Sequence, residues 1–483
     1  MAPRMAASGQ RTAGRHGPRE DAVPRRVLLR PRLALAVVLA LGAAPAACAP
    51  GETGPGGDPT GDVVGPFGAP AGADLEVYVF DGGYGAEYTD TVVDLYHRGL
   101  PGSRVDVSAV QEIATQLQPR FVAGNPPDLV DNSGRPLEVT TLADAGQLTD
   151  LAPLLAAPSF DDPAVTVGET LVDGVVQAGT HDGTLLELRY VNTAYGLWYS
   201  RSLFDRHGWT VPTTWDELLA LGEQAKAEGI ALLAYPGQAM SYLADVFVAL
   251  VGKQAGLGAL EALDNLEPGA WRAPAVVAAF DALAGLRTRG LVLDGCEGLD
   301  HTQAQTAFVR GEALFYPAGS WLENEMRHVT PAGFEMAIAP VPLLDDDAAL
   351  DAAALTVVPG EPFVVPARAA NPAGAMEFLR AMLSREAAAD FTRRTGVPTV
   401  VRGTTGDADL PALRTVTEAI DAGAQPQLRA WFRTWYEPLR TQVFATLGDV
   451  LAGRVTAQEA ATTLQETADD VAADDAITKH TRR

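Results

Sequence analysis

Cysteine and histidine are scarce in this chain of 483 residues, and their scarcity excludes several kinds of metal site. The two cysteines, Cys48 and Cys296, are too few for a disulfide framework or a cysteine-rich metal centre. The seven histidines are scattered, and His301 has no His or Cys neighbour at ligand spacing. The sequence also lacks a Gly-rich phosphate loop, a dinucleotide fingerprint and a Ser-His-Asp signature. We therefore expect no metal and no cofactor, and we expect Cys296 to be a small buried residue.

Basic residues are also few in comparison with acidic ones. The net charge is −25, from 36 basic and 61 acidic residues. Eight of the basic residues and two of the acidic ones lie in the first 32 positions, so the rest of the chain has 28 basic and 59 acidic residues, a net charge of −31. Because so acidic a surface repels phosphate backbones, nucleic acid is excluded as a partner.

The apolar run Leu33–Leu41 is too short to cross a bilayer. A basic stretch precedes this run, and small residues and Cys48 follow it, in the order of a secretory signal. Ala46 and Ala47 suit a bacterial lipoprotein signal, in which the cysteine is acylated, but Pro45 stands where such signals usually have Leu. Residues 1–47 therefore predict an exported protein, with either lipidation of Cys48 or ordinary cleavage after an alanine.

Two further features concern the start of the chain. Arg25 and Arg26 resemble a twin-arginine signal, and an arginine pair is also common in ordinary export signals, so both routes stay open. Residues 48–73 are rich in glycine and proline and are expected to form a flexible tether. The length of the remainder suits two or three lobes.

Strands and helices alternate after the tether, which predicts an α/β fold with a mainly parallel sheet. Asp81, Tyr84, Asp131 and Asn132 follow expected strands, where ligands of such sheets bind. The alternative is that these residues only form turns. The expected strands are 75–80, 104–110, 128–130 and 363–365, and the expected helices are 86–98, 111–123, 215–228, 275–289, 372–383, 385–394 and 456–473, with a frayed C-terminal end.

Three motifs lie far apart in the chain: Tyr199–Phe204 with Gly208–Leu218, Phe308–Ala313 with Gly319-Ser320-Trp321, and Leu451–Thr456 with Glu459-Ala460. In order and spacing they resemble the motifs of the extracellular solute-binding proteins of carbohydrate ABC importers, the group that includes maltose-binding protein.

Further strings resemble the N-acetylglucosamine/diacetylchitobiose-binding subfamily of that group. They are Phe80–Gly85, Leu117–Asp128, Asp131–Gly134, Ala157–Ser159, Tyr195–Ser200, Asp264–Pro268, Ala270-Trp271, His301–Gln305, Gly319–Met326 and Gly360–Phe363. The resemblance covers residues 75–470.

The resemblance implies a two-lobed periplasmic-binding-protein-like fold, similar to maltose-binding protein, with a hinged cleft between the lobes. One lobe would comprise residues 74–184 and 337–402, and the other residues 185–336 and 403–483. The resemblance also implies a monomer that binds a sugar without transforming it. Such a protein passes its sugar to the permease subunits of an ABC importer, and its lipid anchor holds it at the outer face of the cytoplasmic membrane.

A sugar site needs aromatic platforms for C–H faces, and carboxylates and amides for hydroxyls. The resemblance favours Trp321 and one of the C-terminal tryptophans as platforms, although an aromatic side chain taken alone is more often a core residue. The candidate ligand-binding residues are Asp81, Tyr84, Asp131, Asn132, Trp198, Tyr235, Gln238, Trp271, Gln303, Trp321, Glu323, Asn324, Glu361, Trp431 and Trp435.

Two other functions stay open at this point. One is binding of a different oligosaccharide in the same kind of cleft. The other is glycoside hydrolysis, which needs two carboxylates on facing elements, one with a raised pKa. No such pair stands out among the many acidic residues of the sequence.

Overall fold

The computed structural model describes residues 63–404, 412–417 and 428–482, and Thr60–Arg483 form one compact unit. The signal segment 1–47, Cys48 and the tether up to residue 62 lie outside the described residues, so those expectations stay predictions. Within the described ranges, no helix is both long and apolar enough to cross a membrane.

The described chain begins with a small hairpin inside the range expected to be tether. Its strands β1 (Val63–Val64) and β2 (Ala69–Pro70) pair antiparallel, and Ala69 is buried in the adjoining core. Gly65, with φ +75°, makes the turn. Ordered structure therefore reaches back to Val63, earlier than Gly/Pro content alone indicates.

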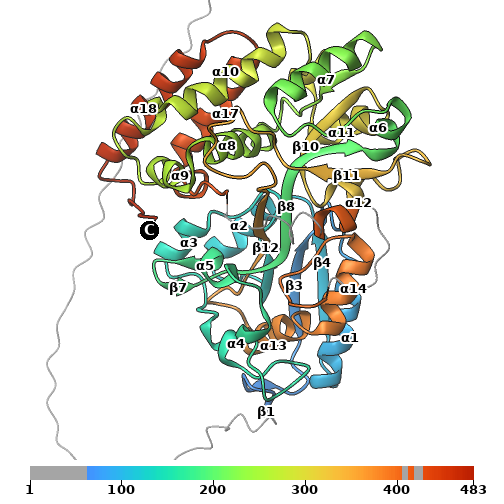
Figure 1. Cartoon of the computed structure of the whole chain (residues 1–483). Helices are drawn as coiled ribbons and strands as arrows, with labels where there is room; N and C mark the ends of the chain where they lie inside the picture. Colours follow the sequence, from blue (N-terminus) through green and yellow to red (C-terminus); the bar gives the residue numbers. More distant parts are fainter. Residues whose placement is uncertain (1–62, 405–411, 418–427, 483) are drawn as a thin grey trace, which may run out of the picture. The chain divides into compact units, whose positions relative to one another are not determined.

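Eight strands of the described chain form one mixed sheet (Figure 1). Strand β3 is parallel to β4 and β5, and β10 is parallel to β9. β12 pairs antiparallel with β5 and β8, and β8 pairs antiparallel with β10 and β11. The expectation of a mainly parallel sheet is therefore wrong, because only the first three strands follow the alternating strand-helix pattern. In spatial order the strands are β4 (Val105–Val110), β3 (Leu75–Phe80), β5 (Leu129–Asp131), β12 (Thr356–Val364), β8 (Leu188–Ser200), β10 (Ala313–Gly319) and β9 (Ala231–Leu233), with β11 (Met336–Ala339) also paired to β8.

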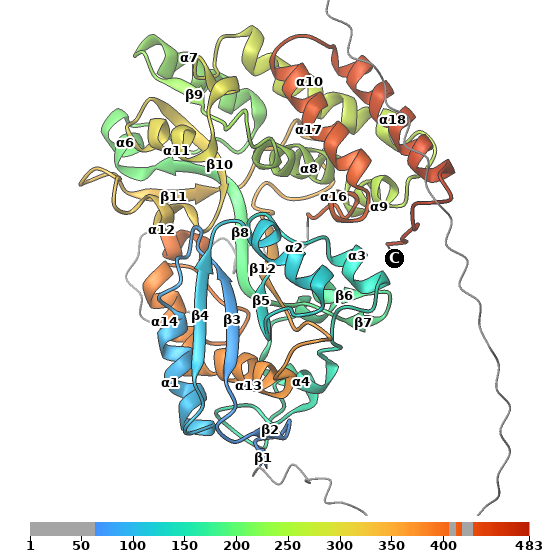
Figure 2. The ribbon, with the colours of Figure 1, turned by 180° about the vertical axis from the view of Figure 1, so that it is seen from behind.

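Helices cover both faces of the first half of this sheet, because successive side chains of a strand point to opposite sides. Leu75, Val77 and Val79 of β3 belong to a core with α1, α13 and α14, whereas Tyr78 and Phe80 pack on the other side with α2 and α3 (Figure 2). The helices are α1 (Thr89–Gly99), α2 (Ile113–Ala123), α3 (Val139–Asp144), α13 (Pro372–Met382) and α14 (Arg385–Thr395).

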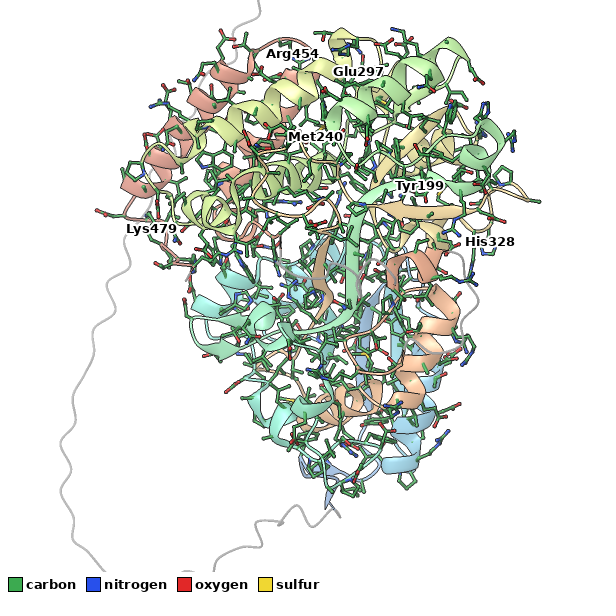
Figure 3. The ribbon with its side chains drawn as sticks, in the orientation of Figure 1. Tyr199, Met240, Glu297, His328, Arg454 and Lys479 are labelled. Atoms are coloured by element: carbon green, nitrogen blue, oxygen red, sulfur yellow. The ribbon has the colours of Figure 1, made fainter. Side chains whose placement is uncertain are left out.

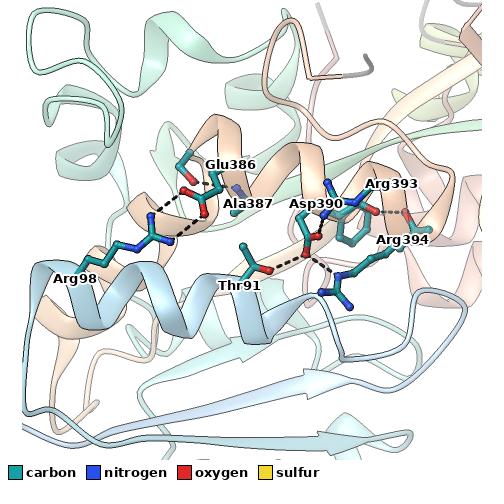
Figure 4. Close-up of polar contacts among 10 residues, drawn as sticks. Thr91, Arg98, Glu386, Ala387, Asp390, Arg393 and Arg394 are labelled. Atoms are coloured by element: carbon teal, nitrogen blue, oxygen red, sulfur yellow. Dashed lines mark hydrogen bonds and ion pairs between the residues drawn. The ribbon is translucent and has the colours of Figure 1, made fainter. Parts of the chain in front are cut away.

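Polar contacts join α1 to α14, although about 290 residues separate them in the sequence (Figure 4). Arg98 donates to both carboxylate oxygens of Glu386 at 2.8 and 3.0 Å, and Thr91 Oγ1 donates to Asp390 Oδ2 at 2.7 Å. The first pair is exposed and contributes little, whereas Asp390 is buried. The Thr91–Asp390 bond therefore contributes more to the contact between the two helices.

A second, larger core surrounds β9, β10 and β11. Trp271 and Phe280 both stack on Phe247 in this core, and the partly buried Tyr199 and Met240, labelled in Figure 3, pack against it. Its helices are α6 (Arg201–His207), α7 (Trp215–Ala227), α8 (Ser241–Ala255), α9 (Leu257–Asp264), α10 (Pro274–Thr288), α11 (His301–Val309), α12 (Leu322–Met326), α16 (Phe432–Trp435), α17 (Glu437–Leu451) and α18 (Ala457–Ala473).

Strand β8 passes from the first core into the second (Figure 1). Its first half pairs with β12 and contributes Leu188 and Tyr190 to the first core. Its second half pairs with β10 and β11 and contributes Leu197 and Trp198 to the second. Two cores joined by a shared strand suit a two-lobed fold, and the lobe boundaries given above stay a prediction.

The expected helices and strands are confirmed, with small shifts at their ends. Besides the predicted parallel sheet, two expectations need correction. β12 starts at Thr356, well before residue 363, because it pairs along β8. The C-terminal tail is packed and not frayed, since Arg482 donates to buried Asp264 at 2.8 Å and His480 N donates to Tyr436 Oη at 3.0 Å.

The remaining short elements connect these parts of the chain. Cys296, which opens one of them, is fully buried as expected. They are α4 (Ala152–Ala156), α5 (Val175–Gly179), β6 (Thr180–His181), β7 (Thr184–Leu185) and the single 3-10 turns η1 (Gly168–Thr170), η2 (Ala270–Arg272) and η3 (Cys296–Gly298).

Candidate functional site

A sharp corner at the end of β10 places a tryptophan where the two cores meet. β10 ends at Gly319, and the buried Ser320 accepts a hydrogen bond from Ala194 N of β8 at 3.3 Å. Trp321 then leads into α12, and its side chain is partly exposed. A Cβ at Gly319 would lie 1.9 Å from the Trp321 ring. Glycine is therefore required at this position for the ring to lie back over the strand.

Two tyrosines, one from β8 and one from α8, pack edge-on against this ring. The centroid of Tyr195 is 5.4 Å and that of Tyr242 is 6.1 Å from the centroid of Trp321. Both tyrosines also line a small pocket together with Asp245. The pocket encloses about 10 Å³, which is room for about one water molecule.

The loop after β3 reaches Trp321 from the first core. Asn324 Nδ2 donates to the carbonyl oxygen of Gly83 at 2.6 Å. A Cβ at Gly83 would lie 2.9 Å from Trp321 Cβ. The close approach of loop and tryptophan therefore depends on glycine at this position.

Two carboxyl groups meet in the first core, near this junction. Asp131 ends β5, Glu361 lies in β12, and the two strands pair with Phe363 opposite Asp131. Asp131 accepts hydrogen bonds from Ser133 Oγ at 2.5 Å and from Phe80 N at 3.2 Å. Burial raises the pKa of Asp131 to about 6. Burial, followed by the charge of Asp131, raises the pKa of Glu361 well above its ordinary value. The buried pair therefore binds a proton more tightly than two exposed carboxyl groups would.

Tyr84 lies close to this pair and is buried. Its ring packs edge-on against Phe391 with centroids 5.4 Å apart. Burial, and next the charge of Glu361, raise the pKa of the Tyr84 phenol, while the hydroxyls of Thr193 and Ser320 act in the opposite direction. Tyr84 Oη nevertheless has no hydrogen-bond partner.

A ladder of stacked side chains lies in the segment that precedes α17. The guanidinium of Arg429 is 3.9 Å from the centre of the Trp431 ring. Trp431 stacks on Trp435, and Trp435 stacks on His480, with centroids 5.7 and 5.2 Å apart. Burial, then the charge of Arg189, lowers the pKa of Arg429 to about 9, so this arginine is still charged at neutral pH. Arg429 and Trp435 thus already cover much of the Trp431 ring.

Two ion pairs flank the ladder. Arg433 pairs with Asp245, and Arg189 donates to Glu187 at 2.6 Å. His181 Nε2 lies 3.0 Å from the same Glu187 oxygen. Burial raises the pKa of Glu187, but the charges of Arg189 and His181 outweigh this effect and lower the pKa to about 2. Glu187 therefore stays ionised across the physiological range.

Five of the expected site residues meet at this junction, namely Tyr84, Asp131, Trp321, Asn324 and Glu361. Glu323 follows Trp321, and burial raises its pKa to about 7 while a hydrogen bond from Ala412 N acts in the opposite direction.

Four other expected residues are buried, and packing or local hydrogen bonds surround their side chains, although Trp271 Nε1 has no hydrogen-bond partner. Trp198 and Trp271 are fully buried in the second core, and Trp198 Nε1 donates to Ala318 O at 3.0 Å. Tyr235 is buried next to Cys296, whose sulfur accepts from Tyr235 N. The amide of Asn132 exchanges two hydrogen bonds with the Leu137 backbone. We assign these four side chains to packing and loop structure.

The last group of expected residues lies on exposed turns. Gln303 caps the start of α11 together with Asp300, and Gln238 donates to Gly298 O at 2.8 Å. Asp81 is exposed at the end of β3. For these residues, turn and cap chemistry accounts for the residue type.

Several residues at the junction were not among the expected ones. Ser133 and Ser320 lie inside the strings that carry the family resemblance, so their motif positions gave a signal. No sequence signal marked Thr193, Tyr242 or Arg429, because only the pairing and packing of distant elements bring these residues to the junction.

The chemistry of the junction is that of binding. Among the described residues there is no group of three or more His, Cys, Asp or Glu side chains that would hold a metal ion. An aromatic ring with hydroxyls, amides and carboxyls around it suits a polyhydroxylated ligand.

Comparisons with known proteins agree with this picture. Residues 59–389 match the family described as bacterial extracellular solute-binding protein. The chain is 37% identical over 472 residues to "Diacetylchitobiose binding protein NgcE" of Streptomyces coelicolor, covering 95% of this chain and 98% of that protein.

Solved structures share the fold. A "chitin oligosaccharide binding protein" superposes with a TM-score of 0.67 at 18% identity, covering 82% of this chain and 98% of the other. RafE in complex with raffinose gives a TM-score of 0.64 at 21% identity, covering 82% and 99%. The fold is thus the two-lobed α/β fold of sugar-binding proteins, and the chain belongs to the bacterial extracellular solute-binding protein family.

Proposed function

We propose that the protein binds N-acetylglucosamine, diacetylchitobiose or a related oligosaccharide around Trp321 and passes it, unchanged, to the permease of an ABC importer. The observation that carries the proposal is the partly exposed Trp321 ring, which the Gly319 corner holds between two tyrosines and next to buried polar groups. The name of the relative NgcE supports the choice of sugar.

Sugar entry requires the junction to open. A drug-sized ligand needs a pocket of about 300 Å³ or more, and the pocket beside Tyr195 and Tyr242 encloses about 10 Å³. We propose that the two cores separate as lobes by bending along β8 and β12, the strands that cross between them, and close again around the sugar. Closure would be the signal that the permease reads.

The place of action follows from the start of the sequence. We propose export, cleavage before Cys48 and lipidation of that cysteine, so that the protein stays at the outer face of the cytoplasmic membrane as a monomer. Metabolic labelling with a fatty acid, in a host that processes lipoproteins, tests this against the variant Cys48→Ala. Label retained by Cys48→Ala would contradict it.

The alternative of a different oligosaccharide stays open, because relatives of this fold bind various sugars. Glycoside hydrolysis is disfavoured by the geometry. Hydrolases hold their two carboxyls about 5 to 9.5 Å apart, with the bond to be cleaved between them, whereas Asp131 and Glu361 contact each other directly.

Calorimetric titration with amino sugars and neutral oligosaccharides tests the proposal. Trp321→Ala should weaken binding of the preferred sugar by about 2 kcal/mol or more. Trp209→Ala is the matched control, because Trp209 is also partly buried but stacks on His207 just after α6. A folded Trp321→Ala variant with unchanged affinity would remove this ring from the site, and absence of sugar binding by the parent protein would refute the function.

A further inference from the structure

Two buried polar atoms beside the Trp321 corner have no hydrogen-bond partner. They are Tyr84 Oη and Glu361 Oε2, and the Tyr84 side chain is only 8% exposed. An unsatisfied buried polar atom costs about 1–3 kcal/mol, and native proteins leave few of them. A ligand that pairs with both atoms would recover this energy.

These atoms belong to one small region. Among neighbouring charges, that of Glu361 has the largest effect on the Tyr84 phenol, and the hydroxyls of Thr193 and Ser320 lie close to the same phenol. Tyr84 and Glu361 nevertheless do not hydrogen-bond to each other. A ligand group that reaches both atoms would satisfy both at once.

Both side chains are held in place. Tyr84 packs against Phe391, and Glu361 contacts Asp131, which is itself fixed by Ser133. Glu361 also has φ +49°, in the left-handed region that is costly for a residue with a side chain. Strain of this kind, about 1–3 kcal/mol, concentrates at binding positions. The backbone therefore holds this carboxyl in position at a cost in the stability of the fold.

The two atoms have opposite hydrogen-bonding roles. The Tyr84 hydroxyl can donate, and the partnerless Glu361 Oε2 can accept. A sugar hydroxyl has its donor and acceptor on one oxygen. An acetamido group has its N–H and its C=O on different atoms, which suits two protein atoms that do not reach each other.

We propose that Tyr84 and Glu361 form a specificity subsite for the acetamido group of an amino sugar. The Tyr84 hydroxyl donates to the acetamido carbonyl oxygen, and Glu361 Oε2 accepts from the acetamido N–H. This assignment rests on the proposed function and adds the feature of the ligand that the site reads. Asp131 and Ser133 position the Glu361 carboxyl.

Four variants in two matched pairs test the subsite. Tyr84→Phe removes the donor, and Tyr190→Phe is its control, because the Tyr190 hydroxyl is also buried without a partner but adjoins Asp390 within the first core. Glu361→Met removes the acceptor. Glu361→Gln keeps it, since its amide NH2 can face Asp131 while its oxygen accepts from the ligand.

The measurement is the affinity ratio between diacetylchitobiose and cellobiose, which has the same linkage with hydroxyls in place of acetamido groups. Calorimetry gives the affinity for diacetylchitobiose, and competition calorimetry gives the affinity for cellobiose where its direct heats are small. We expect Tyr84→Phe and Glu361→Met each to lower the preference for diacetylchitobiose at least tenfold, and Tyr190→Phe and Glu361→Gln to keep it within about threefold of the parent. Thermal unfolding shows whether each variant is folded, and the tyrosine pair alone suffices if Glu361→Met does not fold.

The failures are distinguishable. If the parent protein binds neither sugar, the proposed function fails. If it binds diacetylchitobiose but the variants weaken both sugars equally, or neither, the acetamido subsite is refuted while the function stands. A loss of preference in Glu361→Gln as large as in Glu361→Met would mean that an acceptor oxygen at this position does not carry the preference, which also overturns the assignment.

Discussion

The substitution Gly83→Ala gives a direct test of whether closure of the two cores contributes to affinity. An added Cβ would lie 2.9 Å from Trp321 Cβ and 3.1 Å from two atoms of its ring system. Contacts under 3.0 Å are essentially never seen for a Cβ, so the loop after β3 and the Trp321 corner must move apart. Overpacking of this kind costs about 1–3 kcal/mol.

Gly83 follows β3 of the first core, whereas the Trp321 backbone continues from β10 into α12 of the second core, although its ring packs against the first core. The cost should appear only in the closed form, because separation of these elements would relieve the contact. Gly83→Ala should therefore weaken sugar binding by about 5- to 150-fold. The unfolding temperature of the ligand-free protein should change little. Calorimetry measures the affinity, and small-angle scattering measures the compaction that the sugar causes.

A suitable control is Gly285→Ala in α10, where an added Cβ meets no atom within 4 Å. This variant should keep the parent affinity and compaction. If Gly83→Ala binds sugar with the parent affinity and compacts as fully as the parent protein, the contact between loop and tryptophan plays no part in closure.

Three further predictions concern stability, each measured by denaturant or thermal unfolding. Arg482→Ala should destabilise the fold by about 3 kcal/mol, because it leaves the buried Asp264 without its cation. The control Arg454→Ala breaks a more exposed pair with Asp449 and should cost under about 1 kcal/mol. Equal losses of stability in the two variants would contradict the reasoning. Thr456→Ala should cost about 0.5–2 kcal/mol by removing the capping box of α18, and an unchanged stability would show that packing alone holds this helix end. Folding raises the pKa of Glu323 from 4.5 to about 7, so the folded protein binds this proton more tightly than the unfolded chain does. The stability that this proton contributes is full below pH 4.5 and is lost as the pH rises through 7. Glu323→Gln should remove that loss, at most about 3 kcal/mol, and an identical pH profile in the variant would refute the buried carboxyl.

Local chemistry made most elements predictable. The start of α7 carries a capping box in which Thr214 accepts from Glu217 N while the Glu217 side chain reaches back. β3 alternates buried and partly exposed residues along its length. Such signals depend on neighbours within four residues, so the sequence contains them in full. The extent of β12 was missed because its first half is set by pairing with β8, far away in the chain.

The candidate site divides in the same way. Seven tryptophans look alike in the sequence, and burial alone separates Trp321 from Trp198 and Trp271. Motif position pointed to Trp321, Asp131 and Glu361 individually. It did not show that Asp131 and Glu361 touch, because that contact exists only once β5 and β12 pair across 230 residues of chain.

By itself, the sequence determined that this is an α/β chain with an acidic composition and the motifs of a solute-binding family, and it predicted an export signal. These properties are carried by composition, by short-range periodicity and by residues close together in the chain. The tertiary structure decided which aromatic ring stays open, which polar atoms are buried without partners, and where two cores meet. Those properties depend on surfaces that distant segments bury from one another, and no local pattern encodes which surfaces will meet.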